Sequence, residues 1–251
     1  MFFIRMLAVS YNERNRNMIW TILLAILIGI LNPIYYLLTY EKTNGNIKQN
    51  EIFRVIDYKQ TIVIFWGLTA LILINYLILD QPALNFQPTF NIFGIVLLVL
   101  ILAFSIVQFK LSVVNQDNFS VVRGKMKHIY HYLPKNRNEL NWFMILSISA
   151  GICEEIIFRL FLYEFLNEHI GLWGAFILAN VAFALTHIGS GKQNLISSFV
   201  LGLVFSAIYY FTENIWLAVL LHIAIDVNSG ILGYRVSALE LETGKKPNHS
   251  N

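Results

Sequence analysis

Charged residues are scarce in this sequence of 251 residues. Only 13% of the chain is Asp, Glu, Lys or Arg, while 57% is hydrophobic, and soluble domains carry about 25% charged residues. This shortage excludes a disordered chain, a coiled coil and an ordinary soluble enzyme. The net charge of +3 is too small to indicate a nucleic-acid partner. The one cysteine, Cys153, excludes an internal disulfide and any paired-cysteine metal site.

Long apolar runs fill most of the chain. A membrane helix needs roughly 20 mostly apolar residues, and about seven stretches reach or approach this length: 18–40, 61–79, 90–109, 140–166, 173–187, 195–211 and 215–233. Backbone polar groups in lipid must be satisfied within their own segment, which favours helices over open sheets. We therefore predict an all-α fold, a polytopic transmembrane bundle of about seven spans in the cell membrane.

Three parts can be distinguished along the chain. Residues 1–139 are predicted to be a scaffold of membrane helices with a basic loop, 140–233 a helical core, and 234–251 a polar tail. Basic residues concentrate in the joints 41–60 and 110–139 and in the tail. Cytoplasmic loops carry an excess of Lys and Arg, so we expect these segments on the cytoplasmic side.

The ionisable residues within the apolar runs all lie in the last four spans. Those in hydrophobic surroundings are Glu154, Glu155, Arg159, His187, His222 and Asp226. A charge near the bilayer centre costs about 2.5–3.5 kcal/mol on insertion scales, so such residues mark functional sites by default. The polar centre of the protein is therefore predicted in the C-terminal four spans, with the first three serving as scaffold.

Helical spacing predicts which of these side chains are neighbours. Residues four apart share a helix face, so Glu155 should meet Arg159, and His222 should lie beside Asp226. Glu154 points elsewhere on its helix and is free to face other helices. A Glu–Arg pair, or one histidine, can serve helix packing alone, but six polar groups at compatible depths favour a site.

The residue types in this cluster suit amide hydrolysis. A carboxylate beside an imidazole can take a proton from water, and a second imidazole can stabilise an oxyanion. The sequence has no Gly-x-Ser-x-Gly elbow and no His-Glu-x-x-His motif. Glu154, His187 and His222 could still bind a divalent metal such as zinc. Cys153 is disfavoured as a nucleophile because it does not share the face of Glu154.

Three motifs resemble those of the CPBP family of intramembrane proteases, which includes the CAAX prenyl proteases and the bacteriocin-processing Abi proteins. The family pattern is Glu-Glu-x-x-x-Arg, then Phe-x-x-x-His, then His-x-x-x-Asn or Asp. This chain has Glu154-Glu155-Ile156-Ile157-Phe158-Arg159, Phe183-Ala184-Leu185-Thr186-His187 and His222-Ile223-Ala224-Ile225-Asp226. The resemblance covers roughly residues 140–233.

The resemblance implies roles for these residues. Glu154 would activate water with His187, His222 and Asp226 would support the oxyanion, and a third group would organise the site: Glu155, Arg159 and Phe183. An ionised Asp cannot donate a hydrogen bond, so Asp226 either orients His222, which we favour, or must be protonated. No cofactor is firmly implied, and a glutamate-based mechanism without metal is favoured over a zinc-dependent one.

The expected substrate is a membrane-embedded or lipidated peptide, cleaved within the lipid bilayer. A non-enzymatic bacteriocin-immunity or regulatory protein with the same fold is the alternative from another class. A proton-coupled transporter is a third reading, although transporters often show an inverted repeat and we detect none. The sequence gives no indication of the oligomeric state.

Overall fold

The structure is a computed structural model that describes residues 18–78, 84–89, 91–190 and 192–244. Helices account for nearly all of these residues, and no β-strand occurs among them. The predicted all-α fold class is therefore confirmed. Residues 1–17 of the predicted scaffold and 245–251 of the predicted tail lie outside the described ranges.

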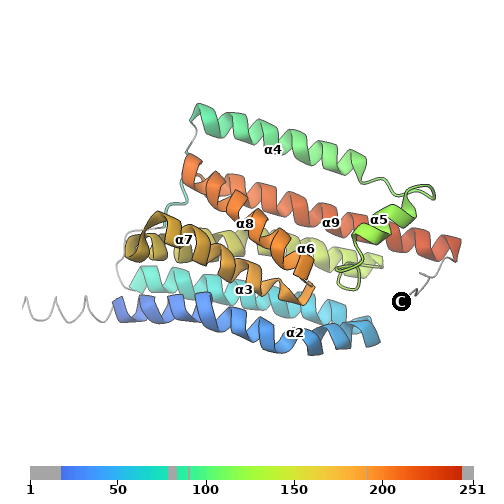
Figure 1. The fold of residues 1–251 in the computed structure, drawn as a ribbon, viewed down its shortest axis with the longest axis horizontal. Helices are drawn as coiled ribbons and strands as arrows, with labels where there is room; N and C mark the ends of the chain where they lie inside the picture. The colour runs from blue at the N-terminus through green and yellow to red at the C-terminus, as the bar shows by residue number, and fades with distance from the viewer. Residues whose placement is uncertain (1–17, 79–83, 90, 191, 245–251) are drawn as a thin grey trace, which may run out of the picture.

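The described helices pass back and forth along one direction (Figure 1). The first, Met18–Gln49, contains the π-helical turn η1 (Leu27–Leu31) and α2 (Asn32–Gln49). It is followed by α3 (Ile52–Ile78), α4 (Ile92–Leu111) and the short α5 (Phe119–Lys125). The remaining elements are α6 (Arg137–Glu155), the π-helix η2 (Ile156–Tyr163), α7 (Glu164–Thr186), the turn η3 (Ile188–Ser190), α8 (Lys192–Thr212) and α9 (Ile215–Thr243).

Asparagine side chains begin several of these helices. Asn91, Asn136 and Asn214 each accept a hydrogen bond from a backbone N–H in the first turn of α4, α6 and α9. Asparagine is among the best residues for this position, because its side-chain oxygen satisfies a donor that has no partner within the helix. These caps set where three of the helices start.

Gly171 divides the helical stretch that follows η2. Its backbone has φ 77° and ψ 172°, a combination that only glycine adopts readily. The chain reverses there, so that residues 137–170 form one rod and residues 172–186 form the next (Figure 1). The two rods correspond to the predicted spans 140–166 and 173–187.

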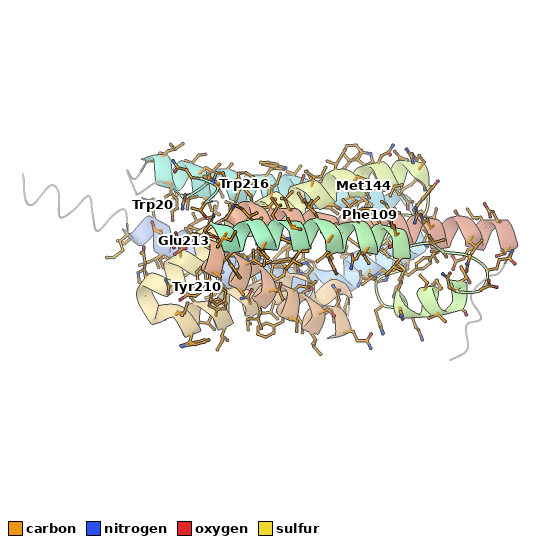
Figure 2. All side chains as sticks on the ribbon, turned by 90° about the horizontal axis from the view of Figure 1, so that it is seen from above. Trp20, Phe109, Met144, Tyr210, Glu213 and Trp216 are labelled. Carbon is orange, nitrogen blue, oxygen red and sulfur yellow. The ribbon has the colours of Figure 1, made fainter. Side chains whose placement is uncertain are left out.

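Five helices are long and apolar enough to cross a membrane: Met18–Gln49, Ile52–Ile78, Ile92–Leu111, Gln193–Thr212 and Ile215–Thr243. The rods formed by residues 137–170 and 172–186 are not among these five. Apolar side chains project outward from the bundle over most of its length (Figure 2), and the side chains of Ile92 and Leu77 are about four-fifths exposed. Lipid is the solvent that such a surface requires.

The helices extend further than the predicted spans. The joint 41–60 was expected to separate two membrane helices, but α2 runs to Gln49 and α3 begins at Ile52. α9 continues past residue 233 to Thr243, so the first part of the expected polar tail is helical. The added helical turns lie outside the apolar runs of the sequence. Charged side chains are compatible with a helix in such positions.

α6 and η2 lie at the centre of the bundle. α6 packs against α3 on one side and α9 on the other, and every residue of η2 is buried. α4 packs against α9 at the edge (Figure 1). The predicted polar centre therefore lies on the most enclosed element of the fold.

Candidate active site

Glu154 and Glu155 occupy the last turn of α6, directly before the π-helical segment that contains Arg159. Glu155 and Arg159 have no exposed surface, and Glu155 Oε1 lies 3.2 Å from Arg159 Nη1. The predicted contact between these two residues is confirmed. π-helical turns inside α-helices are rare and occur frequently at functional sites, which agrees with the position of η2 next to the two acids.

His222 joins α9 to this pair of acids. Its Nδ1 lies 2.8 Å from Glu155 Oε1, and its Nε2 lies 3.4 Å from Glu154 Oε2. The same Nε2 lies 3.7 Å from Asp226 Oδ2, so the predicted proximity of His222 and Asp226 is confirmed. The first distance is a hydrogen bond and the third is too long for one. Glu155 therefore fixes the imidazole more closely than Asp226 does.

His187 lies at the end of α7 and approaches the site from another side. Its Nδ1 is 3.0 Å from the Phe183 carbonyl oxygen and 3.2 Å from Thr186 Oγ1. An imidazole that donates its Nδ1–H to a carbonyl keeps a lone pair on Nε2. Among the described contacts, His187 has no hydrogen bond or ion pair with Glu154. A molecule between them would be needed to join these two side chains.

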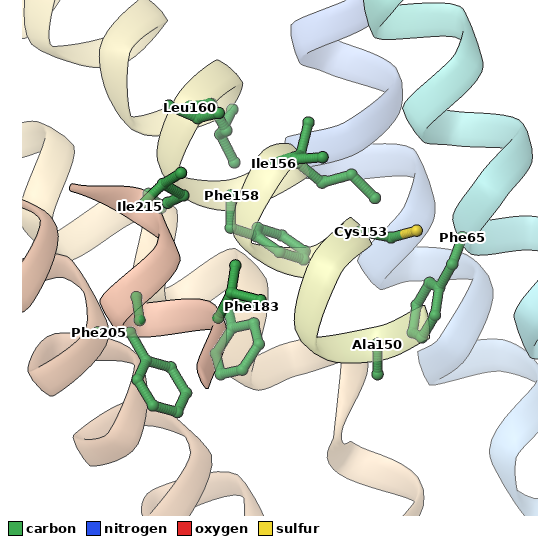
Figure 3. Close-up of a cluster of buried hydrophobic side chains, with 14 of the residues drawn as sticks. Phe65, Ala150, Cys153, Ile156, Phe158, Leu160, Phe183, Phe205 and Ile215 are labelled. Carbon is green, nitrogen blue, oxygen red and sulfur yellow. The ribbon is translucent and has the colours of Figure 1, made fainter. Parts of the chain in front are cut away.

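Aromatic rings hold the imidazoles and the guanidinium in place. Phe205 stacks on His222 with ring centroids 4.8 Å apart, and the Phe183 ring lies 4.7 Å from that of His187. The guanidinium of Arg159 is 4.5 Å from the Phe183 centroid, a cation–π distance. Figure 3 shows Phe183 and Phe205 in the apolar cluster around α6. The predicted organising role of Phe183 thus has a structural counterpart at the centre of the site.

One cavity of about 370 Å³ connects the candidate residues. Four of them line it, and they come from three separate helices: Glu154, His187, His222 and Asp226. Phe183 also lines it, whereas Glu155 and Arg159 lie behind the wall. A volume of this order is typical of a small-ligand site, so the three sequence motifs converge on one space of that size.

A buried polar network behind the cavity includes residues that the sequence analysis missed. Arg159 Nη2 donates to Asn180 Oδ1 at 3.3 Å and to the Gly202 carbonyl at 3.1 Å. Asn180 Nδ2 in turn donates to Ser206 Oγ at 3.0 Å. Asn180 precedes Phe183 by three residues and therefore shares its helix face. The only sequence signal was an amide side chain within an apolar run, and its contact with Arg159 appears only in the fold.

The geometry does not favour a metal centre formed by the predicted ligands. Within the described ranges, no group of three or more His, Cys, Asp and Glu side chains is arranged to hold a metal ion. Glu154 and His222 are close together, but no described hydrogen bond or ion pair joins His187 to Glu154. We therefore derive no chemical step through a metal.

A comparison with protein families identifies the region that contains all three motifs. Residues 136–228 match the family model described as "Type II CAAX prenyl endopeptidase Rce1-like". This region is Rce1-like. The match confirms the resemblance seen in the motifs, and together with the apolar helices it supports a multi-pass membrane protein. No curated protein and no solved structure gives a significant match to the chain.

Proposed function

We propose that this protein is an intramembrane endopeptidase that hydrolyses a peptide bond of a membrane-associated or lipidated substrate. The observation that carries the proposal is the convergence of Glu154, His187, His222 and Asp226 on one cavity within a bundle of membrane helices. Scaffold alone would favour apolar side chains at these positions, because buried ionisable groups are costly in a membrane. The Rce1-like region supplies the reaction class.

In the proposed reaction, Glu154 is the general base. A water molecule between Glu154 and the Nε2 lone pair of His187 loses a proton to the carboxylate as its oxygen attacks the substrate carbonyl carbon. The proton then passes to the amide nitrogen, and the carbon–nitrogen bond breaks to give an acid and an amine. A positioned base of this kind contributes about 10²–10⁴ in rate.

His222 is proposed to stabilise the oxyanion. Its Nδ1–H donates to Glu155 at 2.8 Å, and in the imidazolium form, which the carboxylates of Glu154 and Asp226 favour, the ring also presents an Nε2–H at the cavity wall. A donor fixed in advance stabilises developing negative charge without reorganisation during the reaction. Arg159 and Asn180 act indirectly. Arg159 holds Glu155 in position, and Asn180 holds the guanidinium of Arg159.

The test is peptide cleavage by the purified full chain. A library of farnesylated and unprenylated peptides is incubated with the parent protein and with Glu154→Gln, His187→Ala and His222→Ala. We expect each variant to insert normally and to lose at least about 100-fold in cleavage rate. Glu164→Gln is the matched control, since Glu164 is hydrogen-bonded to Tyr209 and does not line the cavity.

The same assay separates the proposal from its alternatives. Cleavage should survive a chelator, and loss that zinc restores would overturn the metal-free mechanism. Undiminished cleavage by Glu154→Gln would remove Glu154 from the reaction. If no library peptide is cleaved, while the parent and Glu154→Gln bind a membrane partner equally well, the non-enzymatic immunity or regulatory role would replace the protease.

A further inference from the structure

The cavity continues well beyond the catalytic residues. From Glu154 it follows α2 and α3 toward the end of the bundle where the segment between α5 and α6 lies (Figure 1). Its wall there includes Tyr36, Asp57, Gln60 and Tyr132. None of these residues falls in the Rce1-like region 136–228. The N-terminal part of the chain, expected to be only scaffold, therefore forms part of the substrate space.

Asp57 is a carboxylate in this wall without a cationic partner. Tyr132 is its neighbour in the cavity wall, and no ion pair formed by the described residues includes Asp57. The nearby cations are engaged elsewhere. Arg54 is 2.6 Å from Glu139, and Lys59 lies 4.3 Å from the centre of the Trp142 ring.

The described lining of the cavity contains three carboxylates, namely Asp57, Glu154 and Asp226, and neither Lys nor Arg. Glu154 and Asp226 face His222, so Asp57 is the acid that has no positive group opposite it. A charge within a membrane helix bundle normally pairs with another charge or marks a substrate path. A cationic group on the substrate would supply the positive charge that is missing opposite Asp57.

The position of Asp57 relative to Glu154 gives the spacing. α3 and α6 run in the same direction, since Arg54 pairs with Glu139 and Trp66 bonds to Ser149 further along. Asp57 is therefore level with about residue 142, and Glu154 lies about 18 Å further along α6 at 1.5 Å per residue. An extended peptide covers about 3.3 Å per residue, so this separation corresponds to about five residues.

We propose that Asp57 is a specificity-determining residue that binds a Lys or Arg side chain of the substrate, about five residues from the scissile bond. The inference rests on the proposed function, because it takes the cavity to be the substrate-binding space. Tyr132 lies beside Asp57 in the same wall. An acidic substrate residue at the same position would be repelled.

Binding to a chain that cannot cleave tests this site directly. The host is full-length Glu154→Gln, and the probes are labelled, N-acetylated dodecapeptides with one farnesyl-cysteine and Lys, norleucine or Glu at each other position in turn. We expect Lys at one position to bind about 10-fold more tightly than norleucine, and Glu to bind more weakly, as expected for a charge pair worth about 1.4 kcal/mol. Asp57→Asn should remove both differences.

Two controls accompany the binding measurement. Glu51→Gln removes an exposed acid just before α3 and should leave the Lys preference intact. Peptides with a free N-terminus in place of Lys test whether a terminal amine is bound instead. Thermal unfolding of each variant confirms that the fold is kept.

The outcomes separate this inference from the proposed function. Equal binding of Lys and norleucine peptides at all positions, or a Lys preference that survives Asp57→Asn, would overturn the role of Asp57. Tight binding of the free-amine peptides alone would overturn the assignment to a side chain. If the Lys preference depends on Asp57 but the chain with Glu154 cleaves none of these peptides, the binding site stands and the protease proposal fails.

Discussion

At the scale of single residues, the two nitrogens of His222 have different partners. Nδ1 is hydrogen-bonded to Glu155 at 2.8 Å, whereas Nε2 lies 3.7 Å from Asp226. The sequence favoured Asp226 as the residue that orients this ring. The distances favour Glu155 in that role, because an imidazole is oriented by the group that takes its N–H at hydrogen-bond distance.

This geometry predicts unequal effects of two conservative substitutions. Asp226→Asn should lower kcat/KM by no more than about five-fold, because a partly exposed pair is worth about 1 kcal/mol. Glu155→Gln should cost about 100-fold, since it releases His222 and strands the buried charge of Arg159. The measurement is peptide cleavage with each variant, normalised to the fraction that is folded. An equal loss in both variants would restore Asp226 as the orienting residue.

The motif residues could be found from the sequence because their spacing is local. Four-residue spacing places Glu155 beside Arg159, and His222 beside Asp226, in any helix. The contacts between motifs are not local, and no spacing rule predicts them. The packing of α9 against α6 decides that Glu155 holds His222 and that Asp226 does not. Asp57 and Asn180 were missed for the same reason, since their roles depend on what lies opposite them in the folded bundle.

At the scale of helices, α8 approaches the site through a position that only glycine fits. A Cβ atom at Gly202 would lie 2.6 Å from Asn180 Oδ1 and 3.3 Å from Arg159 Nη2. Contacts of 2.6 Å do not occur for real Cβ atoms, so α8 or the Asn180 amide would have to move. Gly202 thus sets the distance between α8 and the network behind the cavity.

Gly202→Ala should therefore weaken both the fold and the reaction. We expect the free energy of unfolding to fall by about 1–3 kcal/mol, the usual cost of overpacking, and cleavage to fall with it as the Arg159 contacts shift. Denaturation in mixed micelles and peptide cleavage measure the two effects.

Gly67→Ala is the matched control for this substitution, because a Cβ at Gly67 on α3 meets no atom within 4 Å. It should leave the fold unchanged or slightly more stable, since Ala favours a helix more than Gly does. Equal stability of Gly202→Ala and Gly67→Ala would show that α8 is not held at this distance.

The helices themselves were largely predictable, but their internal irregularities were not. Runs of apolar residues gave the long helices, because membrane thickness fixes their length. The π-helical turns η1 and η2 lie inside such runs, where composition does not reveal whether the hydrogen bonds reach four or five residues back. The helix extensions to Gln49 and Thr243 were missed because these turns are polar. Hydropathy identifies helices within apolar runs and does not identify them in polar segments.

At the scale of the whole molecule, several contacts tie together the end of the bundle to which the cavity extends beyond α6. Asn44 at the end of α2 donates to the Gly189 carbonyl and pairs with His131 Nε2 at 3.1 Å. The His131 carbonyl accepts from Arg54 Nε on α3 at 2.9 Å. The segment before α6 is thus bonded to α2 and α3, and through Asn44 to the turn after α7. Asn44 and Gly189 also line the cavity, so these contacts, called the rim below, belong to its wall at this end.

Burial makes this rim sensitive to acid. The pKa of His131 is lowered from its ordinary value of 6.5 to about 4, mainly by burial and further by the positive charges of Lys48 and Arg54. Between pH 6.5 and 4 the unfolded chain binds a proton at this residue that the folded chain does not. Stability therefore rises with pH through this window and is lost as the pH falls through it.

His131→Gln should flatten that part of the stability profile, because glutamine keeps a hydrogen-bond donor for Asn44 but does not titrate. Thermal unfolding between pH 4 and 7.5 measures the effect as the difference between parent and variant, which cancels the other titrating groups. His128→Gln is the matched control, since His128 is an exposed histidine of the same segment. Superimposable profiles of the parent and His131→Gln would mean that this histidine does not link the rim to pH.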